Sequence, residues 1–477
     1  MGRFQRTVGV IVLGTALLGA GLLLLAVSAE DRGPAEPARS GLMFGVWEVL
    51  YDTTAPAPSV LAAAISISLL FASFVALLER RMTNRSRQSF APATLPLAPR
   101  PVMAETDGVF AGPVTVTVLI PAYNEEVMLS QTLSSLLEQS VPPRRIIVVA
   151  DNCTDGTVDI ARDAGVEVFE TVENSLKKAG ALNQALRKVL PEQGDNDLVM
   201  VMDADTMLDD GFLEAAVRRM STDRALMAVG GLFYGEDGEG LLGQFQRNEY
   251  IRYARDMRRR RGRVYVLTGT ASLFRSRALR RVAASRGEQL PGVSGDVYDT
   301  HALTEDNELT LALKSLGALI ISPAECTVVT EVMPTWRALW AQRLRWQRGA
   351  LENLGAYGVT PQTFRYWLQQ LAIGYGVIAL GVYLLLIGIM VLALTNVVVF
   401  PFWMGLGLVF TVERVVTVWR GGWAARLLAI TLLPELAFAM FLNLVYLKGV
   451  LDLTLRRRAG WTHVQQTAPT PRPGAKQ

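Results

Sequence analysis

Two aspartates of this chain, Asp203 and Asp205, stand at the end of an apolar run and could bind a divalent cation. The run 198–202 is typical of a buried strand, and carboxylates at positions i and i+2 point to the same side of a strand. Carboxylate oxygens suit Mg²⁺ or Mn²⁺, which also bind phosphate oxygens. The spacing therefore predicts a metal site beside a phosphorylated ligand, although aspartates of a turn or helix cap have the same pattern.

Two further acids, Glu305 and Asp306, precede the apolar helical pattern 309–316. A carboxylate at this place could act as a general base. The alternative is structural, because acids at a helix N-terminus are stabilised by the helix dipole.

Gln342, Arg345 and Trp346 fall in an amphipathic helical pattern that runs from about 334 to 357. An arginine can clamp a diphosphate with its planar fork, and an indole ring can stack beneath a sugar. An interfacial helix whose tryptophans lie at headgroup depth is the alternative, and both interpretations can hold together.

Short β-branched runs alternate with helical patterns and should position these residues. The expected strands are 114–120, 145–150, 166–170 and 198–202, and the helical patterns between them are 125–138, 176–190 and 210–220. This alternation predicts a doubly wound α/β domain, which binds ligands at the carboxyl ends of its strands.

Five motifs lie in order along this domain, and together they resemble the processive family 2 glycosyltransferases. They are Pro-Ala-Tyr-Asn-Glu at 121–125, Ala-Asp-Asn-Cys-Thr-Asp-Gly-Thr at 150–157, Asp-Ala-Asp at 203–205, Thr-Glu-Asp at 304–306 and Gln-x-x-Arg-Trp at 342–346. That group contains the cellulose, chitin, hyaluronan and poly-N-acetylglucosamine synthases. The similarity covers about residues 113–355 and the flanking spans, and it implies a GT-A-like fold.

The resemblance implies a nucleotide site at the first strands. Tyr123 and Asp151 would hold the uracil, as an aromatic face and as a carboxylate accepting from the ring N–H; a core tyrosine and a helix N-cap are the alternatives. The other residues expected at the nucleotide are Glu125, Lys178 in its Lys-Ala-Gly segment, Asp203 and Arg345.

Metal, base and acceptor roles follow from the same comparison. Asp205 is the first candidate for the metal ligand, with Asp203 reaching the ribose or a metal-bound water, and Asp306 is preferred over Glu305 as general base. The residues expected at the acceptor are Gly269, Thr270, Gln342 and Trp346. For Gly269 and Thr270, a tight turn after a strand is the alternative.

The composition indicates a membrane protein. Of 477 residues, 50% are apolar and 19% are charged, and the stretches 8–27 and 60–78 are each long enough to cross a bilayer. A signal peptide is the alternative for the first stretch. Arginines precede the first stretch and follow the second, which predicts that the N-terminus and everything after Arg80 are cytoplasmic.

Other classes of site are excluded by composition. Two cysteines cannot form a disulfide framework and two histidines cannot form a His-rich metal site, so any metal should have oxygen ligands. The net charge of +3 is uninformative about nucleic acid, and the lack of a basic stripe interleaved with aromatics over a whole domain predicts no nucleic-acid partner. The basic run 258–263 is either a solvated surface or a contact with anionic lipid.

Apolar blocks at about 367–395, 397–418 and 424–450 predict two or three further spans. Three full spans would leave the arginines 456–458 outside the cell, against the positive-inside rule, so four and five spans in total both remain open. The predicted organisation is 1–81, two transmembrane helices with a short extracytoplasmic loop; 82–112, linker; 113–333, catalytic domain; 334–362, interfacial helix; 363–455, C-terminal transmembrane helices; and 456–477, polar tail.

The resemblance implies an inverting enzyme of the plasma membrane that extends a β-linked polysaccharide from a UDP-sugar, with UDP-N-acetylglucosamine preferred, and threads the product outward. Since no second cytoplasmic domain follows the spans, the shorter chitin or poly-N-acetylglucosamine synthases are the expected relatives. Expected partners are the UDP-sugar, the polysaccharide acceptor and the bilayer, with room for an accessory export or regulatory subunit. The alternatives are a transferase that adds one sugar to a membrane lipid and, as a third class, an inactive scaffold.

Overall fold

The computed structural model describes residues 89–107, 114–392 and 401–457, together with 39–43, 47–51 and single positions between 70 and 88. The chain divides into two compact units, which we call the α/β unit (Thr83–Thr363) and the helical unit (Phe364–Arg457 with Met1–Met82). The predicted span 8–27 lies outside the described residues, as do most of the predicted span 60–78 and the tail from 458 onward.

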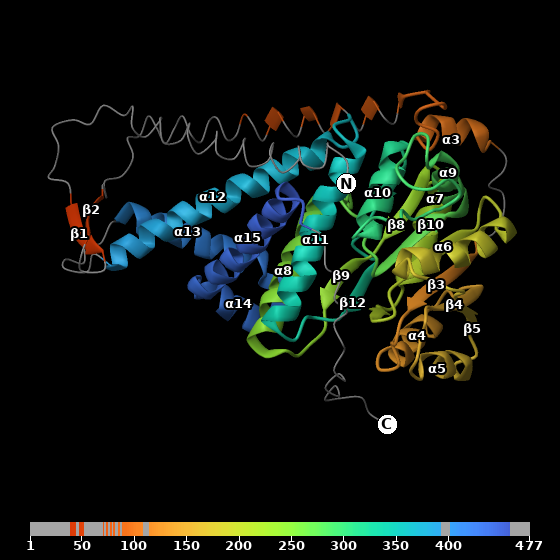
Figure 1. Ribbon diagram of the computed structural model, residues 1–477, viewed down its shortest axis with the longest axis horizontal. Coiled ribbons are helices and arrows are strands. Elements are labelled where there is room, and N and C mark those ends of the chain that lie inside the picture. The colour runs from red at the N-terminus through yellow and green to blue at the C-terminus, as the bar shows by residue number, and fades with distance from the viewer. Residues whose placement is uncertain are drawn as a thin grey trace. The chain divides into compact units, whose positions relative to one another are not determined.

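A seven-stranded sheet with the order β11-β8-β10-β6-β3-β4-β5 forms the centre of the α/β unit (Figure 1). Its strands are β3 (Val116–Ala122), β4 (Arg145–Ala150), β5 (Glu167–Glu170), β6 (Leu198–Met202), β8 (Leu226–Gly230), β10 (Ala271–Arg275) and β11 (Leu319–Ile321). Strands β3 to β6 are parallel, as the alternation predicts. The sheet as a whole is mixed, because β10, for which the sequence patterns made no prediction, runs antiparallel to both β6 and β8.

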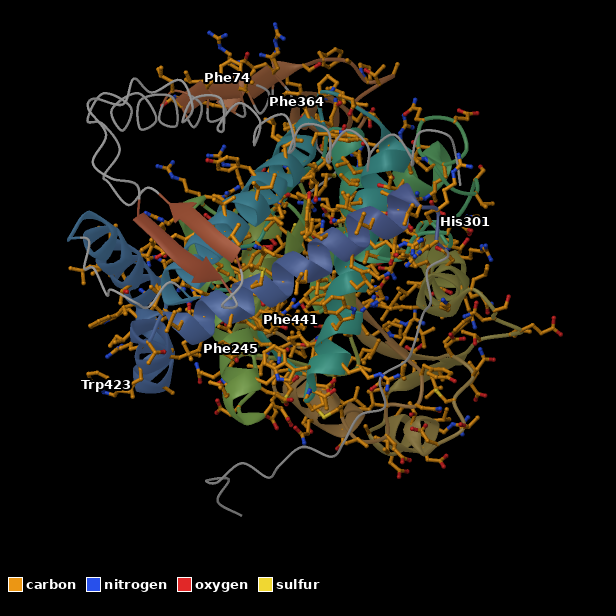
Figure 2. The ribbon with its side chains drawn as sticks, turned by 60° about the vertical axis from the view of Figure 1, so that its left-hand side comes forward. Phe74, Phe245, His301, Phe364, Trp423 and Phe441 are labelled. Atoms are coloured by element: carbon orange, nitrogen blue, oxygen red, sulfur yellow. The ribbon has the colours of Figure 1, made fainter. Side chains whose placement is uncertain are left out.

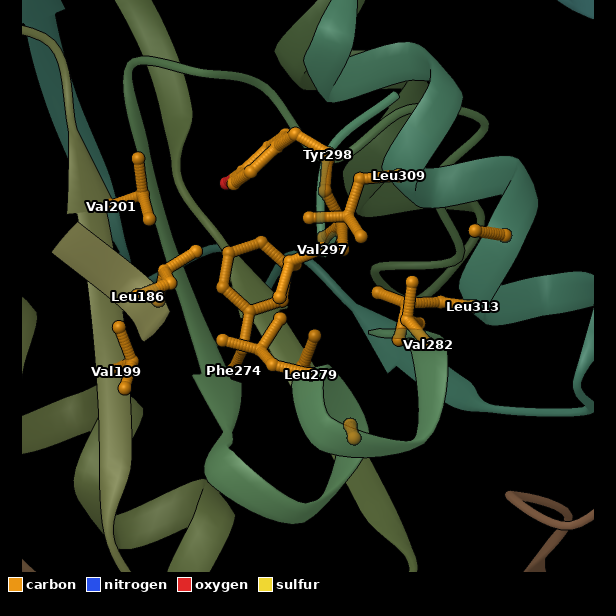
Figure 3. Close-up of a cluster of buried hydrophobic side chains, with 14 of the residues drawn as sticks. Leu186, Val199, Val201, Phe274, Leu279, Val282, Val297, Tyr298, Leu309 and Leu313 are labelled. Atoms are coloured by element: carbon orange, nitrogen blue, oxygen red, sulfur yellow. The ribbon is translucent and has the colours of Figure 1, made fainter. Parts of the chain in front are cut away.

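Helices cover both faces of this sheet because its strands are apolar on both sides. Leu198, Met200 and Met202 of β6 pack in the layer of α4, α5 and α7, whereas Val199 and Val201 pack in the layer of α6, α9 and α10 (Figure 3). The helices are α4 (Leu129–Leu137), α5 (Thr157–Asp163), α6 (Lys177–Val189), α7 (Phe212–Thr222), α9 (Ser276–Ser285) and α10 (Glu305–Ser315), with a 3₁₀ turn at Leu190–Glu192.

A small second sheet lies beside the end of β6. Its strands are β7 (Thr206–Leu208), β12 (Thr327–Thr330) and β9 (Leu232–Gly235), with β12 in the middle. Thr330 is opposite Thr206, so the residues just after β12 are brought next to those just before β7. Two long helices, α8 (Gly240–Arg259) and α11 (Trp336–Tyr357), complete the α/β unit.

Part of the predicted linker packs against the α/β unit. Within 82–112 the chain forms α3 (Pro99–Glu105), and Leu97 and Val102 are buried. The Leu97 amide donates to the Leu316 carbonyl at 2.9 Å, and Arg277 forms an ion pair with Glu105 at 2.6 Å. The described part of this segment is therefore a component of the α/β unit.

The helical unit contains α12 (Phe364–Leu392), α13 (Pro401–Thr417), α14 (Gly422–Ile430) and α15 (Leu433–Thr454), with a 3₁₀ turn at Trp419–Gly421 and a hairpin of β1 (Arg39–Met43) and β2 (Trp47–Tyr51). Among the described residues, Phe364–Leu385 and Leu433–Thr454 are long and apolar enough to cross a membrane. The predicted block 424–450 is not one helix, because it is interrupted before α15 at Leu432, whose φ is +49°.

Candidate active site

The carboxyl edge of the sheet brings most of the predicted residues together. Tyr123, Asp151 and Asp203 follow directly on β3, β4 and β6. Gly269 and Thr270 reach the same edge because β10 is antiparallel to β6 and begins opposite its end. The Asp203 amide donates to the Thr270 carbonyl at 3.2 Å, so the two loops are joined by their backbones.

Lys178, in the first turn of α6, links the two predicted acid motifs. Its ammonium nitrogen lies 2.5 Å from Asp203 Oδ1 and 2.8 Å from Glu305 Oε1. Burial acts to lower the lysine pKa, but the two carboxylates outweigh burial and raise the pKa well above its ordinary value. A Cβ atom at Gly269 would lie 3.1 Å from this ammonium group, so a side chain at 269 would press on Lys178 and the glycine eases the close approach of the loop.

The pKa values of the two acids at the start of α10 are shifted in opposite directions. Burial acts to raise the pKa of Glu305, but Lys178 outweighs it and the pKa lies below its ordinary value, with a smaller contribution from Arg345. Burial and the charge of Glu305 raise the pKa of Asp306 to about 6. A carboxylate with this pKa is ionised at neutral pH and accepts a proton more readily than an ordinary aspartate.

Asp205 lies in a region of excess negative charge. Burial and the Asp203 charge raise its pKa to about 6, and its side chain accepts a hydrogen bond from Thr206 at 3.2 Å. Glu331, which directly follows β12, is a neighbour: burial and the charge of Asp205 raise the Glu331 pKa to about 7. Among the described residues, no cationic side chain forms an ion pair with Asp205 or Glu331.

These carboxylates fit a hard divalent cation with few protein ligands. Within the described parts of the chain, no group of three or more histidines, cysteines and acids could hold a metal ion. Mg²⁺ commonly uses one or two carboxylates and takes its other ligands from water and substrate phosphates. Asp205 and Asp203 supply such a set. After burial, the charge of Asp203 is the next cause of the raised Asp205 pKa, and a cation would compensate that charge. His301 lies at the surface beside Asp299, with 81% of its side chain exposed (Figure 2).

The predicted nucleotide site has a hydrogen-bonded carboxylate, Asp151, and a partly exposed aromatic ring, Tyr123. Asp151 is buried, and its Oδ1 accepts from Asn152, Thr171 and Asn174 at 2.8–3.0 Å. Its other oxygen, Oδ2, makes no hydrogen bond within the described residues. Since α5 begins at Thr157 and Tyr123 is 42% exposed, Asp151 is not a helix cap and Tyr123 is not a core residue.

The Lys-Ala-Gly segment packs against Asn174, which hydrogen-bonds Asp151 of the predicted nucleotide site. A side chain at Gly180 would meet Asn174 and would lie 2.6 Å from the Leu176 Cβ atom. Asn174 is the residue that donates to Asp151, so the glycine leaves room for the amide that orients the carboxylate. Glu125 lies on the neighbouring loop, where its amide donates to the Thr157 hydroxyl at 2.8 Å and joins the first two motif loops.

The Gln-x-x-Arg-Trp residues lie on α11. The Arg343 guanidinium covers the Trp346 ring at 4.4 Å and forms an ion pair with Glu249 at 3.0 Å. The Gln342 Oε1 atom is buried without a hydrogen bond among the described residues. Arg345 influences the pKa of Glu305, which places it near the acid motif, whereas one face of Trp346 is occupied by arginine.

Glu331 is a candidate residue that the sequence patterns did not single out. Glu331 follows the β-branched run 327–330, just as Asp203 follows the run 198–202. An acid directly after a predicted strand was therefore the sequence signal that could have identified Glu331. Its nearness to Asp205 depends on the register between β12 and β7, which no local pattern encodes.

Comparison with known proteins supports the family resemblance. Residues 117–283 match the family model of glycosyl transferase family 2. The poly-β-1,6-N-acetyl-D-glucosamine synthase of Staphylococcus aureus (strain COL) is 27% identical over 279 residues, which are 57% of this chain and 63% of that protein. The synthase of the same name from Staphylococcus epidermidis (strain ATCC 35984) is 28% identical over 245 residues, 50% of this chain and 55% of that protein.

The matched segment therefore carries a family 2 glycosyltransferase domain, and the resemblance predicted from the five motifs is confirmed. The prediction of a glycosyltransferase class of enzyme is confirmed for this domain. The chain spans less than two thirds of the length of these relatives.

Solved structures with some similarity include the mannosyltransferase PcManGT from Pyrobaculum calidifontis in complex with GDP-Man and Mn²⁺. It has a TM-score of 0.45 and 17% identity, and the match covers 83% of this chain and 99% of that one. Glucosyl-3-phosphoglycerate synthase from Mycobacterium tuberculosis, with Mn²⁺, UDP and phosphoglyceric acid, has a TM-score of 0.35 and 19% identity over 55% of this chain and 83% of that one.

Proposed function

We propose that this chain is an inverting, metal-dependent membrane transferase that moves a sugar from a UDP-sugar to a growing β-linked polysaccharide. The observation that carries the proposal is the convergence of Lys178, Asp203, Glu305 and Asp306 at the carboxyl edge of a family 2 domain. Asp203 and Glu305 form ion pairs with the lysine, and Asp306 has the raised pKa of a proton acceptor.

Donor binding would use the loops after the first two strands. The exposed ring of Tyr123 offers a stacking face for uracil, and Asp151 Oδ2 offers an acceptor for the ring N–H. Lys178 and Arg345 supply positive charge for the diphosphate. Asp205 and Asp203 would hold Mg²⁺ or Mn²⁺, which when bound would neutralise negative charge on the departing diphosphate.

Transfer would need only one proton acceptor, since the diphosphate leaves without protonation. Asp306 removes the proton from the acceptor hydroxyl, whose oxygen attacks the anomeric carbon on the face opposite the diphosphate. The new glycosidic bond therefore has inverted configuration. The Gly269 amide, which donates to Asp306 Oδ2 at 3.1 Å, fixes the orientation of the base.

The proposed sugar is N-acetylglucosamine, and the proposed reaction is processive. Support comes from the similarity to proteins named poly-β-1,6-N-acetyl-D-glucosamine synthase and from the Gln-x-x-Arg-Trp helix next to the acid motif. The two apolar helices of the helical unit support a position in the membrane, with the α/β unit in the cytoplasm and the polymer passing outward.

The second candidate is a transferase that places one sugar on a membrane lipid. It is favoured by the Arg343 guanidinium on the Trp346 ring, which leaves less of the indole for a sugar chain. The test is the release of UDP by the full chain in lipid, with UDP-N-acetylglucosamine, UDP-glucose and UDP-glucuronic acid compared. We expect preference for the first donor in the presence of Mg²⁺ or Mn²⁺, and no release with any donor would refute the proposal.

A further inference from the structure

Arg286 and Glu308 form a buried ion pair close to the candidate base Asp306. Glu308 is two residues after Asp306 on α10, and its carboxylate receives both terminal nitrogens of Arg286, at 2.6 and 2.7 Å. The side chains of Arg286 and Glu308 are 0% and 2% exposed. The remaining guanidinium N–H groups donate to the carbonyls of Pro291, Asp296 and Val297 at 2.5–3.2 Å. This arginine thus joins the segment before the Thr-Glu-Asp motif to the first turn of α10.

Helix α11 contacts the same turn through one face. The Tyr357 hydroxyl donates to Glu308 Oε1, and the Asn353 amide donates to the Thr304 carbonyl at 3.0 Å. A Cβ atom at Gly349 would lie 2.7 Å from Thr304 Cγ2, so the two helices are in direct contact there. Residues 349, 353 and 357 are spaced by four and form one stripe along α11.

The network also reaches the helix that carries Lys178. Asn183 of α6 accepts from the amides of Val297 and Tyr298, at 3.1 and 2.9 Å, and donates to the Tyr298 carbonyl at 2.9 Å. Val297 and Tyr298 lie beside the apolar side of α10 in the core (Figure 3). Hydrogen bonds therefore connect α6, which carries Lys178, with α10, which carries Asp306, and with α11 in one continuous network.

We infer that Arg286, Glu308 and Tyr357 are positioning residues that hold the Asp306 turn in register with α11, and this inference rests on the proposed function. None of the three is proposed to touch the sugar or the nucleotide. A buried ion pair contributes little net stability compared with apolar side chains of similar volume, whereas its bidentate geometry fixes orientation. The base lies on α10, and Gln342 and Trp346, two of the proposed acceptor residues, lie on α11, so the register of the two helices affects the distance over which the proton moves.

The test is Tyr357→Phe in the full chain in lipid, because this change removes one hydroxyl and keeps the ring. Small errors of alignment reduce turnover strongly, so we expect kcat to fall about 10–100-fold. The Kd for UDP should stay within about twofold, since Tyr123 and Asp151, the proposed uracil contacts, lie on the loops after β3 and β4, whereas Tyr357 lies at the end of α11 and donates to Glu308. Tyr375→Phe is the matched control, because Tyr375 is 58% exposed on α12, and it should keep wild-type kcat.

A double variant separates positioning from simple stabilisation. In an Asp306→Asn background, Tyr357→Phe should change the residual rate by less than about twofold, because a residue that acts through the base has no effect once the base is absent. The inference is overturned if Tyr357→Phe keeps kcat within twofold, or if it lowers the rate equally in both backgrounds. Absence of activity in the wild type and in Tyr375→Phe would instead refute the proposed function.

Discussion

Replacing the proposed base, Asp306→Asn, should reduce catalysis while leaving the donor site intact. The amide has nearly the size of the carboxyl group. Its oxygen can accept one of the two backbone N–H groups that the carboxylate accepts, which are those of Gly269 at 3.1 Å from Oδ2 and of Asn307 at 2.7 Å from Oδ1. Loss of a general base typically lowers turnover about 10²–10⁴-fold. UDP release by the full chain in lipid measures turnover, and calorimetric titration with UDP should give an unchanged Kd.

The pH dependence of turnover provides a second measurement on the same residue. Because burial and Glu305 raise the Asp306 pKa to about 6, wild-type turnover should fall about tenfold per pH unit below that value. The protonated carboxyl cannot accept the acceptor proton, which gives the sign of the effect. The low-pH limb should be absent from the residual rate of Asp306→Asn.

The contribution of Asp306 to the stability of the fold should decrease with rising pH, whereas turnover increases with rising pH. A carboxyl group whose pKa is raised on folding stabilises the fold most below its ordinary pKa of 3.8, and this contribution is lost as the pH rises through about 6. At pH 8 the ionised group therefore costs the folded state on the order of 1–3 kcal/mol. Asp306→Asn should remove that pH-dependent cost, so the unfolding temperature of the variant relative to the wild type should be higher at pH 8 than at pH 4.

Two results would refute this account of Asp306. Wild-type turnover in Asp306→Asn would show that the residue is not the base. A UDP affinity that fell as far as turnover would place Asp306 in the donor site, and Glu305 would become the next candidate for the base.

Three further changes test the donor site, the metal and processivity. Asp151→Ala should weaken UDP binding about 10–100-fold in calorimetric titration, because it removes a charged acceptor, and unchanged affinity would contradict the uracil contact. Chelator should abolish activity, Mg²⁺ or Mn²⁺ should restore it, and Asp205→Asn should stay folded by thermal unfolding yet lose turnover; full activity in excess chelator would exclude the metal. Trp346→Ala should shorten the polymer on a sizing gel without weakening UDP binding, whereas a lower unfolding temperature with normal product length would identify Trp346 as an interfacial anchor.

Local sequence patterns predicted the strands and the residues at their ends. β4 and β6 have the expected bounds, 145–150 and 198–202, because each is a continuous β-branched or apolar run buried on both faces. The helix at 305–315 begins four residues earlier than its apolar pattern, since acids in its first turn satisfy the helix dipole. Tyr123, Asp151 and Asp203 could thus be placed at one edge from the order of strands alone.

Long-range pairing could not be predicted in the same way. The antiparallel direction of β10 and the register that places Glu331 beside Asp205 depend on contacts between segments far apart in the chain. The buried pair of Arg286 and Glu308 was missed for the same reason, since each residue alone is typical of a solvated helix surface. The break before α15 at Leu432 lies two residues before Pro434, so the sequence did carry a helix-start signal there, which the hydropathy of the block 424–450 masked.

The size of the product made from UDP-N-acetylglucosamine by the full chain in lipid, with no lipid acceptor added, is the most direct test of the proposed function. A processive transferase should release one UDP per sugar and yield long polymer with β-linkages, and Asp306→Asn should yield none. A product that consists only of a lipid carrying one sugar would contradict processive synthesis and establish the lipid transferase in its place.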